Sequence, residues 1–182
     1  MMKSTLRYIL TIVCVFSVLS CEKAPATLYV MGSRKAENPL IKELVFTGDD
    51  IKFYNVTTFE LTLSDLTIEK LIDSLDIYKQ SVYGRLSFYY NDKPLFSMRV
   101  IGENTGSGMI EDLVLIVYGY SRKFYLADGY PLIRKYEWDD FNWSDREAWR
   151  KARDEREENA KRREVEWNIF IKYLSNAGKI VN

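Results

Sequence analysis

The sequence predicts an α+β fold in which an antiparallel β-meander sheet carries one short helix and a long, highly charged C-terminal helix. Apolar and polar residues alternate over residues 59–63, 86–90 and 96–100, which is the period of strands with one buried face. Apolar residues between 68 and 75 recur at helical spacing. Beyond residue 144 the chain is strongly polar and has a helix-start signal and a helix-end signal. This order of elements favours a sheet with helices packed on one side.

Residues 1–20 are predicted to be a signal peptide. Lys3 and Arg7 supply a positive start, and residues 8–19 are almost wholly apolar. That run has the length of a signal-peptide core and is shorter than the roughly 20 apolar residues that span a bilayer. It ends in Val18-Leu19-Ser20-Cys21, which resembles a lipobox. We therefore predict cleavage before Cys21 and lipidation of its thiol, with an ordinary secretory signal and an uncleaved anchor as alternatives.

The composition predicts one folded domain and argues against nucleic-acid binding. Of the two cysteines, Cys14 would leave with the signal peptide and Cys21 would carry lipid, so the exported domain would have no disulfide. The 26 basic and 26 acidic residues balance, and the loss of Lys3 and Arg7 would leave a slight acidic excess. Such a chain has no basic field to attract a nucleic acid.

Residues 21–39 are predicted to be a lipidated tether, because they have little apolar periodicity, although Thr27–Met31 could join a sheet. The α+β domain is predicted over residues 40–131 and begins with a short β-like run at 44–46. Thr47 and Asp50 have the spacing of a helix start, which predicts a helical turn through about Tyr54. A strand at 59–63 follows, and then an amphipathic helix from about Leu66 to Asp76.

The second half of the domain is predicted to be mostly sheet. Asn91-Asp92-Lys93-Pro94 is a strong turn sequence between two alternating runs, so residues 82–101 are predicted to form a hairpin. After a loop at 103–108, the continuous apolar run at 113–118 suits a central strand. A last strand at 123–127 is predicted to end at Asp128-Gly129.

Residues 132–182 are predicted to form an aromatic linker followed by the long helix, packed at least partly on the domain. Ser144 and Glu147 have the spacing of a capping box, and Gly178 suits the far end. At about 1.5 Å per residue, this helix would be a rod of roughly 45–50 Å. Its apolar positions are expected to dock on the sheet, and they are Trp149, Ala152, Trp167, Phe170, Ile171 and Leu174.

The middle of this helix is expected to bury no face. Ten of the twelve residues at 153–164 are charged. Pairs four residues apart, Glu157 with Lys161 and Glu158 with Arg162, would hold it together at about 0.2–0.5 kcal/mol each. This stretch is therefore either a solvated spacer within a packed helix or an arm that meets a partner.

The sequence contains little catalytic equipment. It has no histidine, which removes the common Ser-His-Asp and Cys-His sites and every His-ligated metal site. The glycines at 102–108 lack the ending of a phosphate loop. Asp140, Asn142 and Ser144 alternate like calcium ligands, but Asp145 stands where that loop needs glycine and Lys151 where it needs glutamate. We predict no metal site and no cofactor.

Carboxylates are the remaining candidates for acid/base chemistry of the glycosidase type. None stands out from the others, because acidic residues at turns and strand ends are more often caps and solubilising groups. We therefore predict no catalytic residue. The candidates are Asp49, Asp50, Asp65, Glu111, Asp112, Asp128, Asp139 and Asp140.

Three segments resemble small lipoproteins of Bacteroidota to which no activity is assigned. They are LVFTGDDIKFYN at 44–55 with the strand after it, LVL at 113–115, and KFYLADGYP at 123–131. The resemblance implies an envelope location, with the outer membrane favoured, and Glu22-Lys23 is a short version of that phylum's surface-export signal. Asp73-Ser74-Leu75 resembles its O-glycosylation motif, so Ser74 is a candidate for modification if it is presented outward.

We expect a membrane-anchored envelope lipoprotein that acts as a non-enzymatic binding or accessory protein. Its partner would be another envelope protein, met by the charged helix and by aromatic residues of the linker. One alternative is a carboxylate-dependent glycan-processing enzyme, and another is a periplasmic inhibitor or chaperone-like module. The candidate partner-binding residues are Trp138, Trp143, Arg153, Arg156, Glu157, Lys161 and Arg162.

Overall fold

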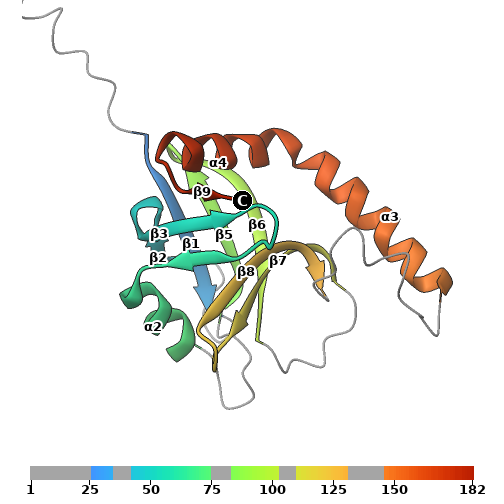
Figure 1. Ribbon diagram of the computed structural model, residues 1–182, viewed down its shortest axis with the longest axis horizontal. Coiled ribbons are helices and arrows are strands. Elements are labelled where there is room, and N and C mark those ends of the chain that lie inside the picture. Colours follow the sequence, from blue (N-terminus) through green and yellow to red (C-terminus); the bar gives the residue numbers. More distant parts are fainter. Residues whose placement is uncertain (1–25, 35–41, 75–82, 103–109, 131–145) are drawn as a thin grey trace, which may run out of the picture.

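The computed structural model describes residues 26–34, 42–74, 83–102, 110–130 and 146–182 (Figure 1). These residues form a larger sheet in the strand order β2-β1-β5-β6-β7-β8 and a smaller sheet in the order β4-β3-β9. The strands are β1 (Leu28–Arg34), β2 (Glu43–Thr47), β3 (Ile51–Asn55), β4 (Leu61–Leu63), β5 (Tyr83–Tyr90), β6 (Lys93–Gly102), β7 (Ile110–Tyr118), β8 (Lys123–Tyr130) and β9 (Ile180–Val181). The helices are the 3₁₀ turn η1 (Gly48–Asp50), α2 (Asp65–Asp73), α3 (Arg146–Arg162) and α4 (Glu164–Asn176).

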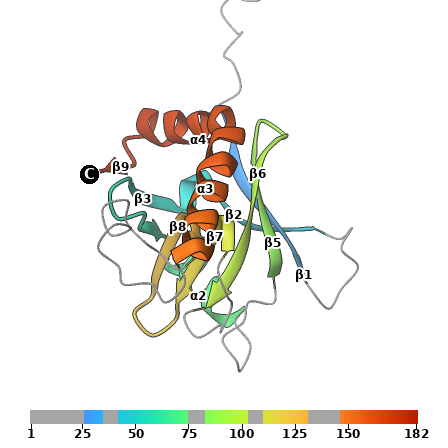
Figure 2. The ribbon, with the colours of Figure 1, turned by 90° about the vertical axis from the view of Figure 1, so that its right-hand side faces the viewer.

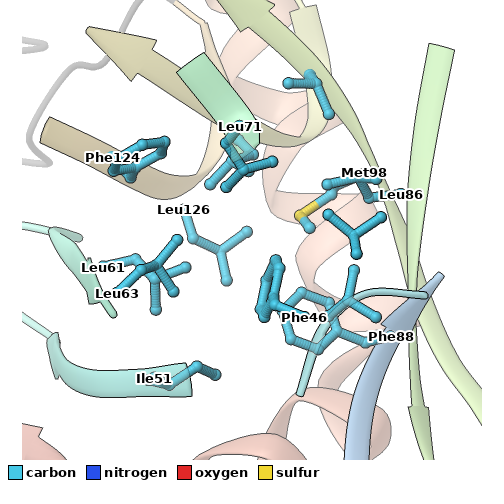
Figure 3. Close-up of a cluster of buried hydrophobic side chains, with 14 of the residues drawn as sticks. Phe46, Ile51, Leu61, Leu63, Leu71, Leu86, Phe88, Met98, Phe124 and Leu126 are labelled. Carbon is cyan, nitrogen blue, oxygen red and sulfur yellow. The ribbon is translucent and has the colours of Figure 1, made fainter. Parts of the chain in front are cut away.

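One hydrophobic core lies between the two sheets (Figure 3). The sheets meet at β4 and β8, where Glu60 bridges Tyr125 and the Leu126 N–H donates to the Phe59 carbonyl. Side chains from both sheets point into the space enclosed between them, and α4 adds Phe170 and Leu174. The residues labelled in the close-up are Phe46, Ile51, Leu61, Leu63, Leu71, Leu86, Phe88, Met98, Phe124 and Leu126.

The predicted α+β class with a mostly antiparallel sheet is confirmed. The 82–101 hairpin is present as β5 and β6, and the predicted helix near 66–76 is present as α2. β4 and β8 lie where strands were predicted at 59–63 and 123–127. In each of these segments the hydrophobic period matches the element, because one face is buried and the other is not.

The predicted tether is wrong for residues 28–34. β1 lies inside the larger sheet, between β2 and β5, and its Leu28 and Val30 are buried. The domain therefore begins before residue 40, and the open alternative of a strand at Thr27–Met31 is the one that the structure has. Gly32 interrupts the apolar alternation because Tyr83, Leu86 and Val45 side chains approach its α-carbon too closely for a β-carbon.

The meander prediction is wrong at β6 and β7, which pair in parallel, with Val100 opposite Leu115. The residues from Leu113 to Val117 are all buried, so β7 has no solvent face. A strand buried on both faces suits parallel pairing. Leu113 and Leu115 belong to the main core, whereas Val114 and Ile116 form a second cluster with Ile101 and Ile110.

The helical turn predicted through Tyr54 is also wrong beyond Asp50. Asp50 accepts hydrogen bonds from the Thr47 amide at 2.8 Å and the Thr47 hydroxyl at 2.9 Å, so the capping signal is real. It closes only the single turn η1, after which β3 begins at Ile51. The chain is extended there because Ile51 and Tyr54 must reach the core, and Tyr54 also pairs with Ile180 of β9.

The single C-terminal rod is wrong as well, because the helix breaks at Arg163 into α3 and α4. The helices also do not share one side of the sheet. Figure 1 shows α2 at the lower left, α4 across the top and α3 at the right, and Figure 2, viewed from that side, shows α3 running down from α4 in front of the sheet. α4 closes one end of the core through its predicted apolar stripe. α3 instead contacts β7 and β8.

Candidate functional site

α3 is the best-defined candidate site, because it carries most of the residues predicted to bind a partner. Arg153, Glu157, Lys161 and Arg162 lie on it with side chains at least partly exposed. Arg156 lies on it too, but is buried. Cys21, Trp138 and Trp143 lie outside the described residues.

The prediction that the middle of this helix buries no face is wrong. Within this stretch Arg156 is only 6% exposed, and it continues the buried face from Ala152, which was predicted to dock and is 3% exposed. The Arg156 guanidinium donates to the Tyr130 carbonyl at 2.7 Å, and the Asn159 amide donates to the Glu111 carbonyl at 2.8 Å. Polar side chains thus fix one face of α3 to backbone carbonyls at the start of β7 and the end of β8.

Gly129 makes room for this contact. Its φ is +107°, and a β-carbon there would lie 2.4 Å from the Arg156 Nε and 2.4 Å from the Ile110 carbonyl oxygen. A residue with a side chain is therefore excluded by both conformation and space. Burial lowers the pKa of Arg156, while Glu111 and Asp128 act in the opposite direction. Since a guanidinium is by far the most basic side-chain group, Arg156 remains a cation at neutral pH.

Arg163 occupies the break between α3 and α4 and holds two carboxylates. Its guanidinium donates to Asp112 at 3.1 Å and also to Asp128. The Arg163 side chain is only 12% exposed, and Asp112 has a second cation, Arg85, at 3.7 Å. We call this pairing of Arg163 with Asp112 and Asp128 the Arg163 clamp. It holds the helical segment at the point where α3, packed on β7 and β8, gives way to α4, packed on the core, which gives a physical reason for the break.

This clamp also bears on the carboxylates considered for acid/base chemistry. Asp112 and Asp128 are brought together, but around an arginine that pairs with both. Asp50 caps η1 and accepts a hydrogen bond from the Ser64 hydroxyl at 2.9 Å, and Asp65 lies 3.5 Å from Lys52. Asp139 and Asp140 lie outside the described residues. Asp50, Asp65, Asp112 and Asp128 thus have structural partners suited to capping and ion pairing.

The opposite face of α3 is exposed and charged. Seven charged side chains of this face, together with Asn159 at its border with the docked face, line a shallow groove of about 620 Å³. Of the two predicted ion pairs, that of Glu158 with Arg162 is present, with 2.5 Å between Oε1 and Nη2. Within α3 as described, Glu157 and Lys161 do not form the second pair. Groups of both signs surround the groove, whose lining is Glu147, Arg150, Lys151, Asp154, Glu155, Glu158, Asn159 and Arg162.

A second, more apolar cleft of about 490 Å³ lies beside the start of β1. Tyr90 contacts Tyr173 edge-to-face there, with ring centroids 6.1 Å apart. Its lining is Ala26, Tyr90, Ile169, Lys172, Tyr173, Asn176 and Ala177. No sequence pattern predicts this cleft, because it depends on how α4 lies against β1 and β5.

Ser74 does not meet the condition attached to its predicted modification. It is only 8% exposed, and its hydroxyl donates to the Leu71 carbonyl at 2.6 Å. A sugar added there would displace this bond, so attachment would have to precede folding of α2.

Among the described residues, no three His, Cys, Asp or Glu side chains gather as a metal site would require. No helix in the same part of the chain is long and apolar enough to cross a membrane. Comparison of the chain with protein-family models, with curated proteins and with solved structures gives no match.

Proposed function

We propose that this protein is a membrane-anchored envelope lipoprotein that binds another envelope protein through the exposed face of α3 and has no catalytic role of its own. The observation that carries the proposal is the contrast between the two faces of this helix. One face is fixed by Arg156 and Asn159, and the other presents a row of charged side chains without apolar cover.

The fixed face gives the exposed face its value for recognition. A solvated spacer needs no particular rotation about its axis, but α3 is held in one rotation by bonds to two backbone carbonyls and by the Arg163 clamp. The exposed charges consequently stand at defined positions. Charges of both signs in a fixed pattern favour specificity for a complementary protein surface over general attraction to a polyanion.

The strength of such a surface depends on many small contributions. An exposed ion pair contributes about 0.2–1 kcal/mol, so no single charge of α3 should dominate binding. Several together can set the orientation and rate of association. We expect single substitutions to change affinity by only a few fold and combined ones to abolish it.

In-cell crosslinking followed by capture of the full-length tagged protein tests the proposal. The test variant changes Lys151, Glu155, Glu158 and Arg162 to alanine, which removes two charges of each sign from the groove. The matched control changes Lys52, Glu60, Glu69 and Lys123 to alanine, which removes two charges of each sign from β3, the residue before β4, α2 and β8. Arg156 is left intact in both because its removal would disturb the fold.

We expect one defined partner that is captured by the wild type and the control but lost from the test variant. A partner captured equally by all three, or no partner, would contradict a binding role for α3. The lipid anchor is tested separately by Cys21→Ala, which should abolish both acyl labelling and membrane fractionation. Unchanged labelling in that variant would contradict the anchor.

A further inference from the structure

The structure leaves only a short connection between the proposed lipid on Cys21 and the folded domain. Thr27 is fixed to the β5–β6 turn, because its N–H donates to the Asn91 Oδ1 at 3.0 Å and its carbonyl accepts from the Asn91 N–H at 3.0 Å. Six residue steps separate Cys21 from Thr27. A fully extended chain covers at most about 20 Å over that length. The anchor therefore cannot lie far from this end of β1.

This reach is small compared with the domain. The roughly 160 residues that would remain after removal of the signal peptide form a domain with a radius of gyration of about 15 Å, so its opposite sides lie well over 20 Å apart. Only one side of the molecule can then meet the membrane. Figure 1 shows that β1 starts beside the C-terminal end of α4, whereas α2 lies at the opposite end of the molecule.

We call the residues around Thr27 the anchor edge: Ala26, Thr27, Tyr90, Asn91, Asp92, Lys93, Lys172, Tyr173 and Asn176. Lys93 and Lys172 are exposed. Two carboxylates lie near these lysines: Asp92 accepts a hydrogen bond from the Tyr29 hydroxyl at 2.9 Å, and Asp49 lies close to Tyr173. The apolar cleft beside Ala26 opens here, with Tyr90 and Tyr173 in its lining. Lysines around amphipathic tyrosines suit the headgroup region of an anionic bilayer.

We propose that the anchor edge rests on the membrane surface and binds anionic phospholipid headgroups through Lys93 and Lys172, which gives the domain one fixed orientation. The inference rests on the proposed lipid anchor. The length of α4, about 20 Å at 1.5 Å per residue, separates this edge from the C-terminal end of α3. The charged face of α3 is thereby held away from the bilayer, where a partner protein can reach it.

Site-specific fluorescence of the full, acylated protein in vesicles tests the orientation. The only cysteines in the sequence are Cys14 and Cys21, so one introduced cysteine carries the only label once the signal is removed and Cys21 is acylated. The label is placed by Asn176→Cys at the anchor edge or by Leu66→Cys on α2, a position 85% exposed. The vesicles contain phosphatidylcholine, either alone or with about one phosphatidylglycerol in three lipids. A fluorescence quencher is attached to a fraction of the headgroups.

We expect the label at position 176 to be quenched several-fold more than the label at position 66 in anionic vesicles. Reversal of both lysines, Lys93→Glu with Lys172→Glu, should remove this difference. It should also lower the preference for anionic over neutral vesicles by about thirtyfold or more, since each lysine near such a surface contributes to binding and its reversal adds repulsion. The matched control, Lys52→Glu with Lys123→Glu, changes two lysines near α2 and should behave as the wild type.

Equal quenching at the two positions in a protein that is acylated and sediments with the vesicles would overturn the proposed orientation and leave the lipid anchor standing. Quenching that the Lys93 and Lys172 reversals leave unchanged would overturn the role of these lysines. A protein that carries no acyl group and stays in solution would overturn the anchor, and the orientation with it.

Discussion

The Arg163 clamp gives the most direct test of how α3 and α4 are held. Arg163→Ala removes both hydrogen bonds to Asp112 and Asp128 and the partly buried stem of the arginine. A buried charge-assisted hydrogen bond contributes about 1.5–3 kcal/mol. The two carboxylates are 45% and 50% exposed, however, and exposed ion pairs contribute about 0.2–1 kcal/mol.

We therefore expect each bond to contribute about 0.5–1 kcal/mol and the substitution to lower the free energy of unfolding by about 1–2 kcal/mol in total. For a domain of this size, that corresponds to a fall of roughly 2–8 °C in Tm. Urea denaturation followed by circular dichroism at a helix band measures the change. Arg162→Ala is the matched control. The Arg162 side chain is 69% exposed and pairs along the helix with Glu158, an interaction that contributes at most about 0.5 kcal/mol.

A double-mutant cycle separates the ion pair from lost packing. Asp112→Asn is combined with Arg163→Ala, and the two effects should be less than additive by about 0.5–1 kcal/mol. Equal losses for the two arginine variants, or strict additivity with Asp112→Asn, would refute the idea that the clamp holds the break in place.

Three further predictions concern stability. Gly129→Ala should cost about 2 kcal/mol or more, because it combines a positive φ with a contact to a backbone carbonyl, and an unchanged urea midpoint would contradict that geometry. Phe170→Ala should cost about 3–5 kcal/mol, against little for Val165→Ala on the exposed side of α4, when both are measured by thermal unfolding. Burial raises the pKa of Asp50, but hydrogen bonds from Thr47, Ser64 and Thr67 outweigh this and leave the pKa below its ordinary 3.8. The stability that a lowered carboxyl pKa supplies is fully present above the pKa of the unfolded state and is lost as the pH falls through the pKa of the folded state. The free energy of unfolding of the wild type should therefore exceed that of Asp50→Asn by its full amount near neutrality, and the difference should vanish in acid.

Most of the elements could be predicted from the sequence, because their signals are local. The β5–β6 hairpin follows from alternation around Asn91–Pro94, and α2 follows from the spacing of Ile68, Leu71 and Ile72. Pairing between distant strands has no such local signal. The parallel contact of β6 with β7, and that of β3 with β9, depends on which faces the rest of the chain covers.

The candidate site was predicted only in part. Exposure of Glu157, Lys161 and Arg162 agrees with a charged surface, but a count of charges cannot separate the two faces of a helix. The positions that dock, Ala152, Arg156, Asn159 and Arg163, are separated by four, three and four residues, which is helical spacing. That spacing was available in the sequence, and it was hidden because three of the four residues are polar. Their partners are backbone carbonyls and carboxylates of β7 and β8, which only the fold brings near.

The exposed edge of the larger sheet has one further consequence. β2 is the terminal strand, and at its irregularity opposite Val30 and Met31 the Lys70 ammonium donates to the carbonyls of Leu44 at 2.6 Å and Val45 at 3.3 Å. Carbonyls at such an edge otherwise invite the N–H groups of a strand from another molecule. The Lys70 ammonium therefore occupies two carbonyls of β2 that a strand from another molecule could otherwise pair with. Acetylation of that amine would leave the core untouched and open the edge to strand-by-strand association between copies.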